Sequence, residues 1–109
     1  MKVVQKLVQD AAAIEPALAA LAAISPQLVL VFGSVTWLQA VAPALQTQFA
    51  QAIRLGCTTA GEISGQGVTD GACVITAVRF DQVRLYSAST PLASMQASYA
   101  AGQALAGSV

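Results

Sequence analysis

The fold prediction depends mainly on residues 28–57, LVLVFGSVTWLQAVAPALQTQFAQAIRLGC. The stretch opens with Leu28–Phe32, a continuous apolar run rich in β-branched residues, which is typical of a strand covered on both faces. Apolar residues then recur at helical spacing as far as Phe49, and Ile53–Cys57 follows as a second strand. A strand, a helix and a strand in one sheet form a right-handed parallel crossover, so we expect both strands to end at the same edge.

Pro43 interrupts the helical pattern between these two strands. Proline lacks a backbone N–H and costs about 3 kcal/mol in a regular helix interior. The sequence therefore predicts either a kink or a later start for this helix, which we expect to end near Gln51.

The residues before Leu28 predict one further strand and one further helix. Lys2–Val8 is short enough to begin either a strand or a helix, and we favour a strand. From Ala11 to Ile24 apolar residues recur every three or four positions, and the preceding Asp10 is a residue type that caps helices. Ser25–Pro26 ends this helix, because proline disfavours helical backbone in the residue before it.

The residues after the unit predict two strands and a closing helix. Ala72–Phe80 and Gln82–Ser89 alternate well enough for strands, and their short connection demands antiparallel pairing in a hairpin. Thr90–Pro91 resembles a helix start, and Gly107 can end that helix. The apolar positions of the closing helix are Leu92, Met95, Tyr99 and Leu105.

These elements together predict the α/β fold class. We expect a mixed sheet in which the parallel strand-helix-strand unit is followed by the antiparallel hairpin and the closing helix, with the helices packed on the sheet.

Length and charge limit the kind of protein this can be. A chain of 109 residues has the size of a single domain. Five Lys plus Arg balance five Asp plus Glu, and the basic patch that nucleic acid binding requires is absent. No apolar run approaches the roughly 18 to 20 residues that span a bilayer, and Met1–Asp10 does not resemble a signal peptide. We expect a cytoplasmic protein with no nucleic acid partner and no membrane insertion.

The chain has two cysteines and no histidine. The lack of histidine excludes zinc sites, haem with a histidine ligand, and Ser–His or Cys–His nucleophile pairs within this chain. We expect Cys57 and Cys73 to be reduced, as in most cytoplasmic proteins, and to be buried in strands as small hydrophobic residues. The sequence predicts no metal and no cofactor.

The stretch GCTTAGEIS, residues 56–64, places polar side chains just past the end of the second parallel strand, as Ser34 does for the first. In open α/β sheets ligands bind beyond the carboxyl ends of the strands. Backbone N–H groups at Ala60 and Gly61 can hold an anion and Glu62 can hold an ammonium group, so a zwitterion or small carboxylate would fit. The candidate ligand-binding residues are Ser34, Trp37, Thr58, Thr59, Ala60, Gly61 and Glu62.

Several alternatives to a binding site are open at this point. GCTTAGEIS can simply close a tight turn, with its hydroxyls bonded to local backbone. Glu62 can pair with Arg54 or Arg79 within the chain instead of with a ligand. Trp37 is either a lid over the site or a core aromatic. The glycine-rich run 65–71 differs in spacing from a dinucleotide loop and predicts a loop or a hairpin.

LVLVFGS, the helix after it, GCTTAGEIS, the glycine-rich gap and the apolar hairpin together resemble the amino-terminal part of the FIST domain, from about Leu28 to Ala106. The resemblance implies an intracellular sensory module that binds small ligands such as amino acids. In that family the module is typically attached to histidine kinases, cyclic-dinucleotide enzymes or chemotaxis-type transducers. Some members bind haem as sensors of nitric oxide, whereas this sequence offers only Cys, Met or Tyr as axial ligands.

The resemblance also implies a larger domain, because the family's domain is about twice as long. We expect residues 1–109 to form one domain, either as a fragment or as a stand-alone half that self-associates as a homodimer. A structural or protein-interaction module without a small ligand is the alternative function. An enzyme would have to rely on Cys57 or Thr58 activated by Glu62, a weak constellation without a histidine base, and we expect no catalysis.

Overall fold

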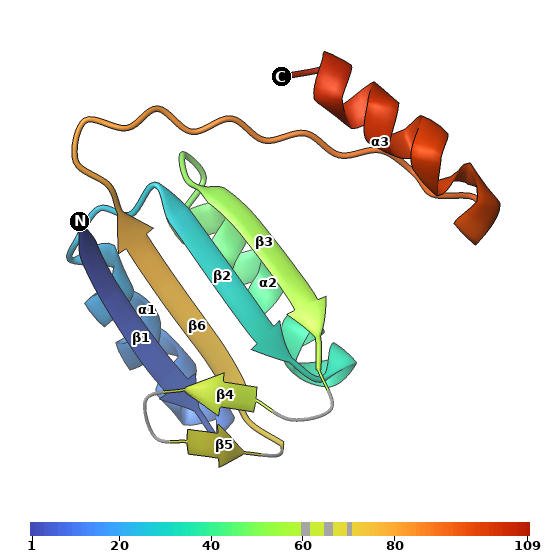
Figure 1. Ribbon diagram of the computed structural model, residues 1–109. Helices are drawn as coiled ribbons and strands as arrows, with labels where there is room; N and C mark the ends of the chain where they lie inside the picture. Colours follow the sequence, from blue (N-terminus) through green and yellow to red (C-terminus); the bar gives the residue numbers. More distant parts are fainter. Residues whose placement is uncertain (60–61, 65–66, 70) are drawn as a thin grey trace.

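The computed structural model describes residues 1–59, 62–64, 67–69 and 71–109, with residues 62–64 and 67–69 described by their backbone (Figure 1). In chain order the elements are strand β1 (Lys2–Val8), the 3₁₀ turn η1 (Ala11–Ala13), helix α1 (Ile14–Ala22), strand β2 (Leu28–Gly33), helix α2 (Val35–Gln48), strands β3 (Ile53–Thr58), β4 (Glu62–Ser64), β5 (Gly67–Thr69) and β6 (Cys73–Arg79), the 3₁₀ turn η2 (Met95–Ala97) and helix α3 (Ser98–Gly107).

Within the described residues, four strands form one mixed sheet in the order β1-β6-β2-β3. Strands β2 and β3 are parallel, with a register that runs from Leu28 opposite Ile53 to Gly33 opposite Thr58. Strand β6 is antiparallel to both of its neighbours, β1 and β2. The α/β class, the mixed sheet and the parallel unit through α2 are therefore confirmed, as is the strand at Lys2–Val8.

The predicted hairpin of Ala72–Phe80 with Gln82–Ser89 is wrong in its second strand. The first strand exists as β6, but residues 83–94 run outside the sheet. The physical reason is that β6 already pairs along both edges, so the segment that follows it has no edge to join. A turn with a positive φ of 55° at Gln82 then carries the chain away from β6.

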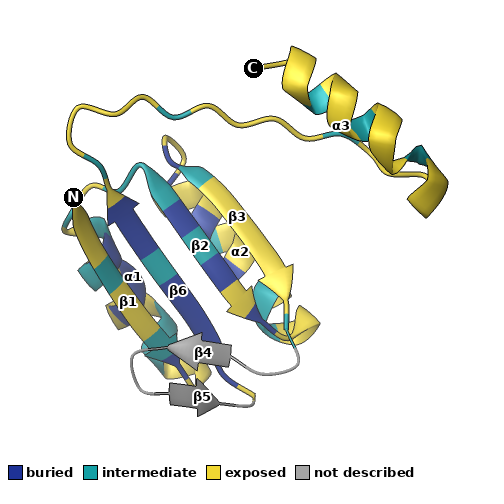
Figure 2. Cartoon of the chain, in the orientation of Figure 1, coloured by how far each residue is buried: buried dark blue, intermediate teal, exposed yellow. Residues whose placement is uncertain are grey.

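Helices α1 and α2 cover one face of the sheet, and the core lies beneath them (Figure 2). Leu18 and Leu21 of α1 are buried in the same cluster as Val41 of α2. The sheet contributes Val29 and Ile75 to that cluster, each with no exposed surface. A fully buried aliphatic side chain of this kind stabilises the fold by about 1.5 to 3 kcal/mol.

Pro43 lies inside α2, which begins at Val35. The later helix start was therefore wrong, and the kink stays a prediction. Proline removes the bond that its N–H would give to the carbonyl of Gln39, and both residues are exposed, so water can reach that carbonyl. The Thr47 hydroxyl donates to the Pro43 carbonyl at 3.0 Å one turn later.

The closing helix starts later than predicted and does not pack on the sheet. The chain is extended past Pro91, and η2 and α3 begin only at Met95 and Ser98. In the described chain no residue of α3 is buried, and Figure 1 shows α3 beyond the β3 edge of the sheet. Of the predicted apolar positions, Leu92, Met95 and Tyr99 are exposed and Leu105 is half-buried.

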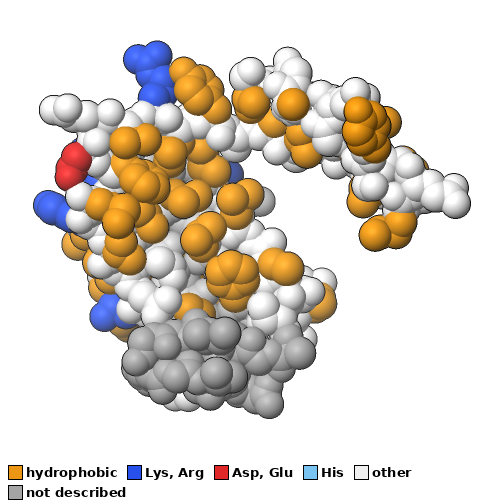
Figure 3. All heavy atoms as spheres, in the orientation of Figure 1, with side chains coloured by type: hydrophobic (Ala, Val, Ile, Leu, Met, Phe, Trp, Pro, Cys, Tyr) orange, Lys and Arg blue, Asp and Glu red, His pale blue; other side chains and the backbone are white. Residues whose placement is uncertain are grey.

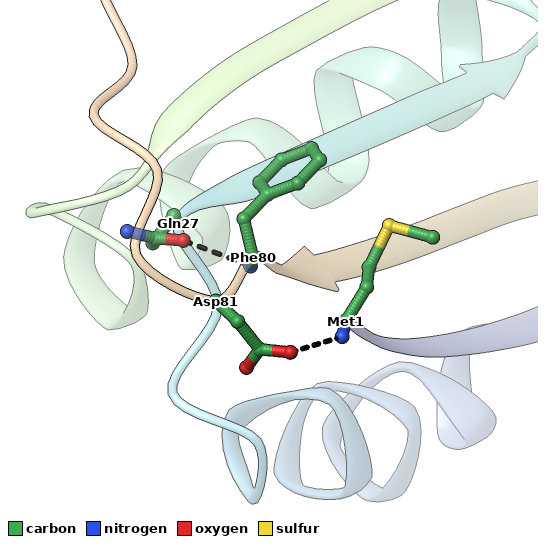
Figure 4. A network of polar contacts seen from close by, with 4 residues as sticks. All are labelled: Met1, Gln27, Phe80 and Asp81. Atoms are coloured by element: carbon green, nitrogen blue, oxygen red, sulfur yellow. Dashed lines mark hydrogen bonds and ion pairs between the residues drawn. The ribbon is translucent and has the colours of Figure 1, made fainter.

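Gln27 joins three strands and the segment that leaves them. Its backbone N–H donates to the Val78 carbonyl at 3.0 Å, and its carbonyl accepts from the Ile53 N–H at 2.8 Å. Its side-chain Oε1 accepts from the Phe80 N–H at 2.9 Å (Figure 4), and its Nε2 donates to the Val83 carbonyl at 3.3 Å. One side chain thus fixes the direction in which the chain leaves β6.

The same corner holds an ion pair between the Met1 ammonium and the Asp81 carboxylate, 2.5 Å apart (Figure 4). The hydrogen bond and the positive charge of that ammonium lower the pKa of Asp81. Both groups are exposed, so the pair contributes little to stability. Gln27, and not this pair, is the main polar link at this end of the sheet.

We expect Gln27→Met to lower the free energy of unfolding by about 1 to 2 kcal/mol, because two hydrogen bonds to backbone groups are lost at nearly constant volume. Each kcal/mol corresponds to roughly 4 to 8 °C in Tm. Urea and thermal unfolding followed by circular dichroism measure the change. Gln39→Met on exposed α2 surface is the control and should stay within about 0.5 kcal/mol. Equal losses in the two variants would contradict the role assigned to Gln27.

Candidate functional site

The carboxyl ends of β2 and β3 lie side by side, as the crossover predicted. Gly33 and Thr58 are register partners at this end. The N–H of Thr59 donates to the Gly33 carbonyl at 3.1 Å, which extends the pairing one step past both strands. The polar residues that follow the two strands therefore share one edge of the sheet.

Ser34 caps α2 at this edge. Its backbone is extended, with φ −69° and ψ 164°, and its Oγ accepts from the Trp37 N–H at 3.3 Å. Serine is among the residue types preferred at this position because the first-turn N–H groups have no helical partner. The positive end of the α2 dipole consequently lies at the same edge as Thr58.

Trp37 is held in place by the body of the protein. Its ring is partly buried against the core, and its indole Nε1 donates to the Gly71 carbonyl at 2.9 Å. The core-aromatic interpretation therefore describes this side chain better than a lid. The bond ties the first turn of α2 to the segment that leads into β6.

Of the other candidate ligand-binding residues, the structure describes Thr58 and Thr59 in full and Glu62 by its backbone. Thr58 is exposed and Thr59 is partly buried. Ala60 and Gly61 lie outside the described residues. Glu62 is the first residue of β4, where it is the register partner of Thr69, and its side chain lies outside the description.

The glycine-rich run after this edge belongs to a hairpin. Strands β4 and β5 pair antiparallel, from Glu62 opposite Thr69 to Ser64 opposite Gly67. This confirms the prediction of a loop or hairpin for residues 65–71, of which 65, 66 and 70 lie outside the described residues.

The first glycine of GCTTAGEIS has a packing role. A Cβ at Gly56 would lie 2.7 Å from Cγ1 of Val31, closer than real contacts allow. Gly33 is similarly crowded, because a Cβ there would lie 3.3 Å from both the Ala72 carbonyl oxygen and Cβ of Trp37. Glycine at these positions lets β3, β2 and α2 approach closely where the site begins.

The prediction that both cysteines are buried is wrong for Cys57. Cys73 is buried under the helices. Cys57 is exposed because it lies near the end of β3, an edge strand that pairs only with β2 in the described chain. The Cys57 thiol donates to the Thr58 carbonyl at 3.3 Å. Neither cysteine is in a disulfide, in agreement with the reduced state that we predicted.

Arg54 and Arg79 are both engaged at the opposite end of the sheet. Arg54 Nη1 donates to the Phe49 carbonyl at 2.7 Å and to the Ala52 carbonyl at 3.3 Å. Arg79 Nη1 donates to the Ser25 carbonyl at 2.8 Å. Each guanidinium thus serves the loops that precede β2 and β3.

A scan against protein-family models matches residues 27–109 to the FIST N domain. The matched range covers most of the chain. The chain belongs to the FIST N family. FIST N domains are sensory domains of signalling proteins. Searches of curated proteins and of solved structures gave no match.

In the described chain, cavities of this FIST N domain lie near both ends of β2 and β3. One of about 330 Å³ lies beside Leu38 and Gly56, close to the candidate edge. Another of about 550 Å³ lies at the opposite end of the sheet, between Gln27, Arg79 and Val83. Among the described residues no cluster of three or more Cys, Asp or Glu could hold a metal ion. None of the helices in the described part of the chain is long and apolar enough to cross a membrane.

We expect Trp37→Phe to lower the free energy of unfolding by about 0.5 to 1.5 kcal/mol, because it keeps an aromatic ring but removes the indole N–H that donates to the Gly71 carbonyl. Urea unfolding followed by circular dichroism measures the change. Tyr99→Phe, an aromatic substitution on exposed α3, should leave the stability within about 0.5 kcal/mol. Wild-type stability in Trp37→Phe would show that the indole bond is unimportant.

The different burial of the two thiols predicts selective modification. Iodoacetamide should label Cys57 in the native protein and reach Cys73 only after unfolding. Intact-mass spectrometry of native and urea-unfolded samples counts the labels, and Cys57→Ser should leave the native protein unlabelled. Two labels on the native chain, or an intact mass two hydrogens below the reduced chain, would contradict the arrangement.

Proposed function

We propose that this FIST N domain binds a small carboxylate or an amino acid at the edge where β2 and β3 end. Binding there would be the input signal of the protein. The observation that supports this most directly is the register of Gly33 with Thr58, which brings Ser34 next to the residues that follow Thr58. Family membership supports the sensory role itself.

The edge offers complementary chemistry for a zwitterion. The first turn of α2 after Ser34 and the backbone N–H groups of Ala60 and Gly61 are expected to receive the carboxylate. Glu62 is expected to receive the ammonium group. Arg54 and Arg79 serve the other end of the sheet, which supports a ligand as the partner of Glu62. A carboxylate in a dry crevice costs several kcal/mol unless a cation meets it.

We also propose a cytoplasmic location, a homodimer and a signalling output domain as partner. Two cysteines outside any disulfide support a reducing compartment. A formal net charge of zero and exposed apolar side chains such as Leu55, Met95 and Tyr99 support self-association. The output domain is supported by the family's place in signalling proteins.

A thermal-shift screen of amino acids and small carboxylates tests the proposed site. At a concentration of 100 times its Kd, a ligand stabilises the fold by about 2.7 kcal/mol, which raises Tm by several degrees. We expect the shift to be lost in Thr58→Val and Glu62→Gln. Fluorescence of Trp37, the single tryptophan of the chain, gives a second readout beside the site.

Two matched variants control the screen. Thr47→Val alters an exposed threonine in the last turn of α2, and Glu15→Gln alters an exposed glutamate in the first turn of α1. Both should bind like the wild type. No shift with any compound would contradict the ligand-binding proposal and favour an interaction module, and loss of binding in the controls would contradict the assigned site.

A further inference from the structure

The face of the sheet opposite α1 and α2 is largely apolar, although it also carries Gln5 and Thr76, which are hydrogen-bonded to each other. Strand residues alternate between the two faces, so the neighbours of the core residues point away from the helices. The open patch, as we call it, consists of Val3, Leu28, Leu30, Ile53, Leu55 and Val78. Figure 3, which looks onto this face, shows hydrophobic atoms gathered over the strands.

The open patch is built as register rows that contain no charge. Val3, Val78, Leu28 and Ile53 lie opposite one another across all four strands. In the next row Leu30 and Leu55 are partners, and the row continues through the polar residues Thr76 and Gln5. Leu55 is 55% exposed and Val3 is 53% exposed in this conformation. Leu28, Leu30 and Ile53 are half-buried, and Val78 is buried. Such a surface favours association with another uncharged apolar surface.

The carboxyl-terminal segment carries a second surface of the same character. We call residues 82–109 the arm. Its exposed apolar side chains include Tyr86, Leu92, Met95 and Tyr99, and its single charged residue is Arg84. A helix as short as α3 is marginal in water by itself, because most helical stability comes from packing. The arm therefore needs a surface to pack on.

In the described chain the arm lies beside its own patch at the start of β3, where Ile53 lines a cavity together with Leu85, but α3 buries no residue there. The Cα radius of gyration is 15.2 Å, against about 13 Å for a compact chain of this length. The arm crosses the start of β3 and leaves a cavity of about 450 Å³ between Ile53–Leu55 and Ser87–Ser89. Beyond that crossing it leads away from the sheet (Figure 1).

We propose that two copies of this chain exchange arms, so that the arm of each copy packs on the open patch of the other. This inference rests on the homodimer proposed above and names its interface. A two-fold pair supplies one arm for each patch, and exchange of identical elements is a common route to dimers. The arm is also within the roughly 20 to 30 residues that one partner contributes to a standard interface.

The bonds at the root of the arm are compatible with exchange. Gln27 holds Phe80 and Val83 and directs the arm outward, so a dimer can form without rearranging the turn after β6. Only the extended residues 84–94 and α3 have to pack against the other copy. The patch and the arm carry one charged side chain between them, Arg84 near the root of the arm, so packing desolvates at most one charged side chain.

Pairs of broken variants test the exchange. Leu55→Gln disables the patch, and the double substitution Met95→Gln with Tyr99→Gln disables the arm. All three residues are exposed in the single chain, at 55%, 81% and 78%, so the variants should fold. Val35→Gln, at a residue that is 57% exposed in the first turn of α2, is the matched control.

Analytical ultracentrifugation of the full chain over a range of concentrations gives the dimer Kd. We expect the wild type and Val35→Gln to dimerise, and each broken variant to weaken dimerisation at least about a hundredfold, since each change occurs twice and costs about tenfold per site. A mixture of the two broken variants should dimerise about tenfold more tightly than either variant alone, because the heterodimer retains one intact arm on one intact patch.

The outcomes distinguish arm exchange from a monomer and from a dimer in which the two patches pair directly. A wild type that stays monomeric overturns the homodimer and the exchange together, while the ligand screen is unaffected. A dimer that survives the arm substitutions overturns exchange and indicates direct pairing of the two patches. Failure of the mixture to associate more tightly than either variant alone, or loss of the dimer in Val35→Gln, also overturns the proposal.

Discussion

The structure depends on the position of β6 between β1 and β2. Lys2 at the start of the chain is the register partner of Arg79, and β6 pairs along its other edge with Leu28–Phe32. Without β6, the described chain would consist of a β1-α1 unit and a β2-α2-β3 unit with no shared strand. These pairings join residues far apart in sequence, and such contacts form slowly because loop closure costs entropy before the contacts stabilise the fold.

The placement of β6 also determines which face of the sheet is covered. Strands β1, β2 and β3 all run in one direction, because β1 and β2 are both antiparallel to β6 and β3 is parallel to β2. The two crossovers, through α1 and α2, proceed in the same direction across the sheet. Right-handed crossovers that proceed in one direction place their helices on the same face. The opposite face is left to apolar residues that these helices cannot reach.

Much of the fold was predictable because it follows from local periodicity. Leu28–Phe32, the helix through Val41 and the strand at Ile53 were recognised from their apolar patterns and from a chirality rule that holds for nearly all crossovers. The error at Gln82–Ser89 has a different origin. Alternation in a sequence identifies a segment that can pair, but whether an edge is available depends on strands elsewhere in the chain.

The candidate site was also predictable only in part. The shared edge of Ser34 and Thr58 followed from the parallel register, whereas the indole bond of Trp37 to Gly71 depends on a tertiary contact. Gln27 was missed because glutamine is common on surfaces and its sequence context gave no signal. Its bonds to the Phe80 and Val83 backbone exist only when β2 and β6 are adjacent.

The proposed ligand edge and the root of the arm lie at opposite ends of the same strands. Strand β2 connects them, from Gly33 at the edge to Leu28, which follows Gln27. A buried strand that is paired on both sides has one arrangement, and a ligand can shift only an equilibrium between states that it binds differently. The arm has no buried helix residue in this conformation, so its position can change without cost to the core. If the proposed edge binds a ligand, we therefore expect the signal to be expressed in the arm rather than in the sheet.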